Sequence, residues 1–200
     1  MRQYQSIVLA SGSASRRQIL SNVGLAVDIV PASIDEIAIR RAMLEDDPDP
    51  AALAVALADA KAANVAMQNP QHPVIGADQI LICHGERFDK VDDLGAAHRQ
   101  LARLQGRTHE LISAVTLHQG ANVLWSTTDT ARLAMRALGD KEISRYLERT
   151  GPAILGSVGC YHLEGKGAWL FDRVEGDFFT VLGLPLLPLL ETLRRLGIVG

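Results

Sequence analysis

Cysteine is scarce in this sequence: only Cys83 and Cys160 occur among the 200 residues, and they lie far apart. Their spacing matches no metal-binding motif. A chain of this length can bury roughly 70% of the surface that its unfolded form exposes, so it needs no disulfide bond for stability. The apolar run at residues 6–10 is far too short for a secretory signal, so we expect reduced thiols in a cytoplasmic protein.

An excess of charge of one sign is also missing. Lys and Arg together number 20 and Asp and Glu 23, which leaves a net charge of −3. Such a chain has no general attraction for nucleic acid or for an anionic membrane, and a phosphate ligand needs a local basic cluster. We therefore expect no nucleic-acid partner.

Long hydrophobic runs are absent as well. The longest apolar-rich segment, residues 51–67, is interrupted by Asp59, Lys61 and Asn64. A membrane span needs ~18 apolar residues in succession, so we expect no membrane partner. The composition that remains, 48% hydrophobic and 22% charged, is that of an ordinary globular protein and excludes disorder for most of the chain. We expect one domain over residues 1–200.

Strand and helix patterns alternate along the chain. An apolar run with β-branched residues at 7–10 leads into a small-residue turn at 11–15 and then a helical pattern that Gly24 ends, which is typical of the first half of a βαβ unit. Further strands are expected at 27–31 and 74–83 and in a hairpin of 110–118 with 122–130; further helices are expected at 51–68, 94–104, 140–150 and 186–196. The pattern predicts the α/β class, with a mixed twisted sheet flanked by helices.

A first polar cluster lies at the turn before the first helix and contains Ser11, Ser13 and Arg16-Arg17. Small residues let backbone N–H groups approach an anion, the helix N-terminus favours negative charge, and an arginine offers a planar fork to phosphate oxygens. The cluster lacks the Gly-Lys-Ser/Thr ending of a Walker A motif. Two interpretations stay open: a phosphate site, or an ordinary N-capped helix with exposed arginines.

Asp78 and Gln79 form a second polar cluster, inside a strand that is otherwise apolar. A buried carboxylate costs several kcal/mol unless it is paired or binds a metal. A functional site is therefore favoured over a structural aspartate at a strand end. Lys90 follows just past the next turn and is a candidate to return to the same strand end as the partner of Asp78.

Two further acidic features, Glu164 and the Asp35-Glu36 pair, are candidates for binding a ligand or a metal ion. Residues 159–167 are rich in glycine, which allows close backbone approach to a ligand, and Glu164 among them could accept hydrogen bonds from a base or hold a metal; a plain surface loop is the alternative. Glu36, beside Asp35, belongs to a carboxylate pair of the kind that binds Mg²⁺, although most such pairs are simply solvated. The six histidines are scattered without zinc-like spacing, and we assign them no function.

Taken in order, these motifs resemble those of the Maf family of nucleoside triphosphate pyrophosphatases. They are Leu9-Ala10-Ser11-Gly12-Ser13 with Arg16-Arg17, Asp35-Glu36, Ala60-Lys61-Ala62, Gly76-Ala77-Asp78-Gln79, Lys90, Gly106-Arg107-Thr108-His109, Glu164-Gly165-x-Gly167, Glu175-Gly176-Asp177 and Gly183-Leu184-Pro185-Leu186. The resemblance runs from residue 7 to residue 196. It implies a two-lobed α/β fold around a deep cleft, similar to that of inosine triphosphate pyrophosphatases, and a homodimer.

The resemblance also implies a reaction. A nucleoside triphosphate would be split between its α- and β-phosphates into a nucleoside monophosphate and pyrophosphate, with the help of a divalent cation, Mg²⁺ or Mn²⁺. Asp78 matches the family's proton acceptor, and it would share the cation with Glu36. The residues that would bind the triphosphate are Arg16, Lys61 and Lys90, with Ser11 and Ser13 at the phosphate turn. A carboxylate base, a metal and converging cations are what such a cleavage needs.

Three positions sort substrates in this family, and here they are Ser15, Gln79 and Glu164. The branch that acts on 7-methyl-GTP has the Asp-Gln and Glu-Gly pairs that this chain shares at residues 78–79 and 164–165. Ser15 matches neither that branch nor the dTTP/UTP branch, and Asp177-Phe178-Phe179 resembles the latter. The sequence therefore favours a 7-methyl-GTP-like substrate, with a dTTP/UTP pyrophosphatase or a non-catalytic nucleotide-binding regulator of cell division as alternatives.

Overall fold

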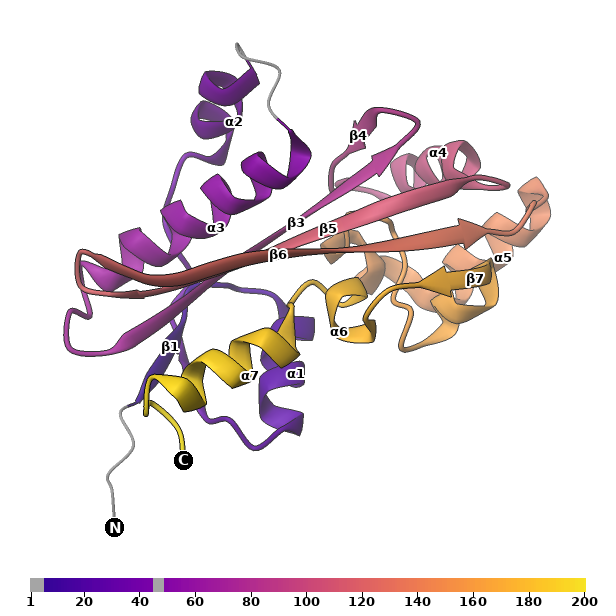
Figure 1. Ribbon diagram of the computed structural model, residues 1–200. Coiled ribbons are helices and arrows are strands. Elements are labelled where there is room, and N and C mark those ends of the chain that lie inside the picture. Colours follow the sequence, from indigo (N-terminus) through magenta and orange to yellow (C-terminus); the bar gives the residue numbers. More distant parts are fainter. Residues whose placement is uncertain (1–5, 45–48) are drawn as a thin grey trace. The chain divides into compact units, whose positions relative to one another are not determined.

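A computed structural model describes residues 6–44 and 49–200 of the chain and has the α/β architecture that the sequence predicts (Figure 1). The strand order in its seven-stranded sheet is β2-β1-β3-β5-β6-β7, and β4 pairs with β3 outside this path. β1 runs parallel to β2 and to β3, whereas β4 and β7 are antiparallel to their partners, so the sheet is mixed. Helices flank it, and the predicted fold class is confirmed.

The chain divides into two compact units. The first comprises residues up to 79, 113–129 and from 183 onward, and the second comprises residues 80–112 and 130–182. The long strands β3 (Pro73–Cys83), β5 (Thr108–Gln119) and β6 (Asn122–Met135) each contribute residues to both units. The sequence predicts one domain over residues 1–200 and a deep cleft. The division into two units decides neither expectation, and both stay predictions.

The first unit contains the βα start of the chain and the two helices that follow it. Its elements are β1 (Ile7–Leu9), α1 (Ala14–Asn22), β2 (Val27–Ile29), α2 (Glu36–Leu44), α3 (Pro50–Ala66) and α7 (Leu186–Arg195), with parts of the long strands. Ser13 caps α1 by accepting a hydrogen bond from the backbone N–H of Arg16, and Asp49 caps α3 with proline in its first turn. In Figure 1, α3 lies on one face of the sheet and α1 and α7 on the other.

Gly76 lets α3 lie directly against β3. A Cβ atom on Gly76 would sit 2.2 Å from the carbonyl oxygen of Ala58 and 2.7 Å from the Cβ of Ala62, and both alanines are fully buried. Residues two apart on a strand share a face, so Asp78 points to the same side as Gly76. The close approach therefore brings Lys61, which precedes Ala62 on α3, to the level of Asp78.

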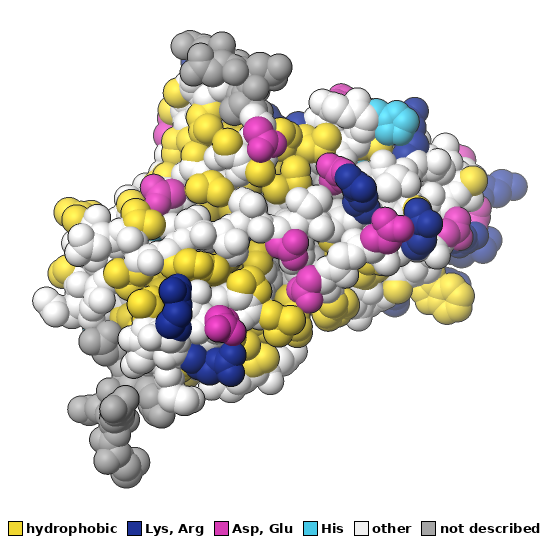
Figure 2. Space-filling model, in the orientation of Figure 1, with side chains coloured by type: hydrophobic (Ala, Val, Ile, Leu, Met, Phe, Trp, Pro, Cys, Tyr) yellow, Lys and Arg dark blue, Asp and Glu magenta, His cyan; other side chains and the backbone are white. Residues whose placement is uncertain are grey.

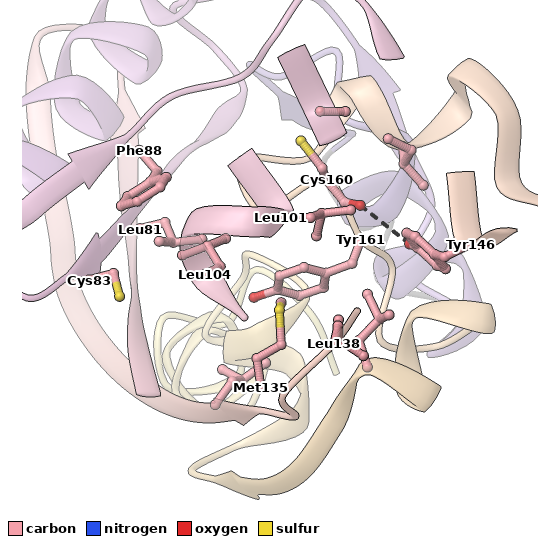
Figure 3. Close-up of a cluster of buried hydrophobic side chains, with 14 of the residues drawn as sticks. Leu81, Cys83, Phe88, Leu101, Leu104, Met135, Leu138, Tyr146, Cys160 and Tyr161 are labelled. Carbon is pink, nitrogen blue, oxygen red and sulfur yellow. Dashed lines mark hydrogen bonds between the residues drawn. The ribbon is translucent and has the colours of Figure 1, made fainter. Parts of the chain in front are cut away.

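The second unit is built around a separate hydrophobic core. It contains β4 (Glu86–Phe88), α4 (Leu94–Leu104), α5 (Asp140–Thr150), the short 3₁₀ helices η1 (Gly151–Gly156) and η2 (Lys166–Leu170), β7 (Phe171–Glu175) and α6 (Phe178–Val181). Figure 3 shows side chains from β3, α4 and α5 meeting in this core, where Tyr146 donates a hydrogen bond to the carbonyl of Cys160 at 3.3 Å. Both cysteines are buried free thiols.

The structure extends several sequence predictions. The hairpin is longer than expected, because β6 continues to Met135 and there pairs with β7, a strand that the sequence did not predict. Helix α2 was also missed, and the glycine-rich segment at 159–167 ends in the first turn of η2. β7 depends on a partner far away in the sequence, which local patterns do not reveal.

Surface charge follows the near-neutral composition. On the face shown in Figure 2, basic and acidic side chains are interspersed and do not gather by sign. Within residues 6–44 and 49–200, no helix combines the length and the hydropathy that crossing a membrane requires.

His109 is buried in the core of the second unit and bonds to a buried tyrosine. It is 1% exposed, its Nε2 lies 2.6 Å from the hydroxyl of Tyr161, and both rings contact Phe171. Its Nδ1 has no hydrogen-bond partner among the described residues. Burial lowers the pKa of His109 to about 4, because the charged imidazolium would lose its hydration. His109 is therefore a neutral core residue.

We expect Gly76→Ala to destabilise the protein by about 1–3 kcal/mol, because the new methyl group must push α3 away from β3. The same displacement should separate Lys61 from Asp78. Gly156→Ala is the matched control, since its added methyl group meets no atom within 4 Å. Urea unfolding of the three proteins checks this expectation, and equal midpoints for Gly76→Ala and wild type would contradict it.

Acid should weaken the fold through His109. Its pKa is lower in the folded protein than the unperturbed value of about 6.5, so the unfolded state binds more protons between these two values. The contribution of neutral His109 to the free energy of unfolding is fully present above pH 6.5, and about 3 kcal/mol of it is lost as the pH falls to 4. Urea unfolding at several pH values should show a shallower decline for His109→Gln than for wild type, and parallel declines would exclude this role.

Candidate active site

The candidate site lies where β1 ends beside β3. β1 pairs with β3 at Val8 and Leu9, and the last bond between them runs from the N–H of Ala10 to the carbonyl of Ile75 at 2.8 Å. The chain then turns into α1, while β3 continues through residues 76–79. Ligands of open α/β sheets bind outside the carboxyl ends of the strands, and the carboxyl end of β1 is such a place.

Beyond the end of β1, Arg16 supplies hydrogen-bond donors to this edge of β3. Its Nη1 donates to the carbonyl of Ala77 at 2.8 Å and to Oγ of Ser11 at 3.1 Å, and its Nε donates to the carbonyl of Gly183 at 2.8 Å. Ala77 lies two residues beyond Ile75, so its carbonyl points to the same edge and Arg16 continues the hydrogen-bond ladder. Burial lowers the pKa of Arg16, and the negative charges of Asp78 and Glu36 oppose that shift.

The first polar cluster thus combines features of both interpretations. Ser13 does cap α1, as an ordinary helix start would require, and Arg17 is exposed. Arg16, however, is buried and fixed by three hydrogen bonds, so the interpretation with two exposed arginines is wrong for this residue. Ser15 is half-buried in the first turn of α1.

Lys61 joins the two carboxylates on the α3 side of the sheet. Its Nζ lies 2.6 Å from Oδ1 of Asp78 and 2.9 Å from Oε1 of Glu36. The second oxygen of Glu36 is 3.0 Å from Arg40, one turn along α2. In the structure Lys61 contacts Asp78, because Gly76 brings α3 so close. Lys90, which the sequence suggested as a partner of Asp78, stays a prediction.

One oxygen of Asp78 is left without a partner. The Asp78 side chain is only 9% exposed, and its Oδ2 makes no hydrogen bond to any of the described residues. A buried carboxylate oxygen in that position costs free energy in the absence of a ligand. It is therefore suited to accept a proton or to bind a cation.

Gln79 points to the opposite face of β3 from Asp78, since neighbouring residues on a strand alternate. Its Nε2 donates to Oγ of the fully buried Ser113 on β5 at 3.0 Å. Gly183, with a φ of +94°, lies close by: a Cβ there would be 3.6 Å from Oε1 of Gln79 and 3.5 Å from Nη2 of Arg16. The side chains of Asp78 and Gln79 therefore lie on opposite faces of β3.

Ser113 was missed at the sequence level, although a signal was present. It interrupts the apolar run of β5 in the same way that Asp78 interrupts β3. The same criterion, a polar residue inside a buried strand, would have found it.

Two of the expected site residues belong to the second unit. Lys90 is exposed just after β4, and Glu164 is exposed in the turn that precedes η2. That turn is tight: the N–H of Gly167 donates to the carbonyl of His162 at 3.1 Å, and a Cβ on Gly167 would lie 2.4 Å from the same oxygen. Their expected roles at the triphosphate and the base stay predictions.

A divalent cation would find two carboxylates here, those of Glu36 and Asp78. Among residues 6–44 and 49–200, no group of three or more His, Cys, Asp or Glu side chains is placed to hold a metal ion. Mg²⁺ commonly binds through one or two carboxylates, with water and substrate phosphates completing its shell. The pair and the unpartnered Oδ2 of Asp78 fit that kind of site.

Comparison with known proteins gives matches along nearly the whole chain. A family model described as Maf-like protein matches residues 6–196. A nucleoside triphosphate pyrophosphatase of Gluconobacter oxydans is 47% identical, with 98% of this chain and 97% of that protein covered. Another of that name, from Granulibacter bethesdensis, is 43% identical over 94% and 96%. A 7-methyl-GTP pyrophosphatase of Mesorhizobium japonicum is 44% identical over 98% of both chains.

A solved structure of a nucleoside-triphosphatase (dITP/XTP pyrophosphatase) from Mycobacterium abscessus is 16% identical and covers 65% of this chain and 72% of its own. Its TM-score of 0.32 is too low to carry an argument about fold or function. The family model and the full-length relatives are decisive, and they agree with the order of the sequence motifs: the chain belongs to the Maf family.

Proposed function

We propose that this protein is a divalent-cation-dependent nucleoside triphosphate pyrophosphatase that releases a nucleoside monophosphate and pyrophosphate. One observation carries the proposal: Asp78 is a buried carboxylate with an unpartnered oxygen, beside Lys61, Glu36 and Arg16. Relatives of matching length that bear this name support the reaction class.

The chemistry follows from these residues. Oδ2 of Asp78 accepts a proton from the attacking water, whose oxygen bonds to the α-phosphorus as the bond to the leaving pyrophosphate breaks. Lys61 carries three N–H donors, two of which are directed to carboxylates, so the third can donate to a phosphate oxygen. A cation held by Glu36 and Asp78 would neutralise charge on the phosphates.

Arg16 and the turn before α1 contribute fixed positive charge. Three hydrogen bonds hold the guanidinium in place before the substrate arrives, so little reorganisation is needed when charge develops on the leaving group. The start of α1, with Ser11 and Ser13, adds the positive end of a helix dipole. In this proposal Lys90 supplies a further cation to the triphosphate.

For the base, we propose a 7-methyl-GTP-like substrate. A methylated guanine carries positive charge and favours a carboxylate such as Glu164 over a neutral amide, while Gln79 offers both a donor and an acceptor to a base edge. The motif that resembles the dTTP/UTP branch has a local role: Asp177 caps α6 by accepting hydrogen bonds from the N–H groups of Phe179 and Thr180. The motif at residues 177–179 is therefore weak evidence for a dTTP/UTP-type substrate.

Asp78→Asn should lower turnover by ~10²–10⁴-fold, because the amide cannot take the proton. Lys61 keeps Glu36 as a charged partner, so the variant should remain folded. Asp59→Asn is the control: it removes a carboxylate of α3 that pairs with His118 instead, and its turnover should be near that of wild type. Near-wild-type turnover in folded Asp78→Asn would refute the role of the base.

A nucleotide panel with Mg²⁺ or Mn²⁺ tests the reaction and the substrate together. We expect pyrophosphate release and the highest kcat/KM for 7-methyl-GTP over GTP, UTP and dTTP, with the preference eroded in Glu164→Gln. Diphosphate and orthophosphate as products would overturn the pyrophosphatase assignment, and binding without hydrolysis would support a regulatory protein. If Glu164→Gln leaves the ranking unchanged, Glu164 does not read the base.

A further inference from the structure

The two carboxylates proposed to bind the cation are already engaged by the chain's own cations. Lys61 contacts Oδ1 of Asp78 and Oε1 of Glu36, and Arg40 contacts Oε2 of Glu36. Three of the four oxygens thus have a positively charged partner, and only Oδ2 of Asp78 does not, among the described residues. The Lys61 side chain is 13% exposed, so water screens its charge only weakly.

We infer that Lys61 competes with the free cation for these oxygens, so the divalent ion binds well only together with the triphosphate. A divalent cation entering alone must displace an ammonium group at 2.6–2.9 Å or sit beside it, and either costs electrostatic energy. The triphosphate brings several negative charges and offers Lys61 new oxygens. The substrate is accordingly the cation–nucleotide complex.

The inference rests on the proposed function, because it takes Glu36 and Asp78 as the ligands of the cation. It adds a thermodynamic coupling between cation and nucleotide that runs through one side chain. By linkage, each of them must then raise the affinity for the other by the same factor. Without the charge of Lys61 this coupling should fall, while the affinity for the free cation should rise.

The test is a titration of free Mn²⁺, followed by electron paramagnetic resonance, in the absence of nucleotide. Lys61→Met should bind Mn²⁺ at least about tenfold more tightly than wild type, because the competing charge is gone. Arg40→Met is the matched control: Arg40 contacts Oε2 of Glu36, and its side chain is 27% exposed against 13% for Lys61, so about a twofold gain is expected.

A second titration uses a non-hydrolysable triphosphate analogue. The analogue should tighten Mn²⁺ binding strongly in wild type and much less in Lys61→Met. An affinity of Lys61→Met for free Mn²⁺ equal to that of wild type, or an unchanged effect of the analogue, would overturn the inference. Since Lys61→Met leaves Asp78 without its charged partner, Mn²⁺ should also raise its Tm more than that of wild type.

Lys61→Gln provides a variant that keeps a polar group beside Asp78, and it should show the same gain in Mn²⁺ affinity. Pyrophosphate release by wild type is measured separately. If that activity is missing, the proposed function fails, whereas the Mn²⁺ titrations by themselves decide the role of Lys61.

Discussion

The close packing of α3 on β3 is the contact on which the candidate site depends. Gly76 leaves no room for a side chain between the strand and the helix, and Ala58 and Ala62 complete the contact. Nζ of Lys61 thereby lies 2.6 Å from Asp78, and Glu36 at the start of α2 lies 2.9 Å from the same Nζ. A larger residue at any of these small positions would separate the charges that make the site.

The end of β1 is the second constraint, because it leaves part of one edge of β3, the edge opposite β5, without a neighbouring strand. Arg16 fills this gap and is held by Ser11, Ala77 and Gly183, which belong to three separate segments of the first unit. A buried arginine is costly unless its N–H groups are satisfied and its charge is balanced. The carboxylates of Asp78 and Glu36 provide that balance, so the basic and acidic parts of the site stabilise each other.

The two units use burial in different ways. In the first, charged groups are buried in a connected set, which favours binding of a charged ligand through any oxygen that lacks a partner. In the second, burial keeps His109 neutral and holds it against Tyr161 within a hydrophobic core. Within the described residues, the buried Arg16 and Asp78 thus lie where the proposed chemistry occurs, whereas the buried His109 of the second unit is neutral.

The sequence by itself determined the α/β class, most of the helices and strands, and the candidates Arg16, Lys61 and Asp78, because each produces a local pattern or an ordered motif. Only the tertiary structure showed that Asp78 pairs with Lys61, that Gln79 faces Ser113 on the other side of the strand, and that β6 pairs with β7. The reason is physical: helix periodicity and capping act over a few residues, whereas ion pairs and strand pairing join residues that only the packing of α3, β3 and their neighbours brings together.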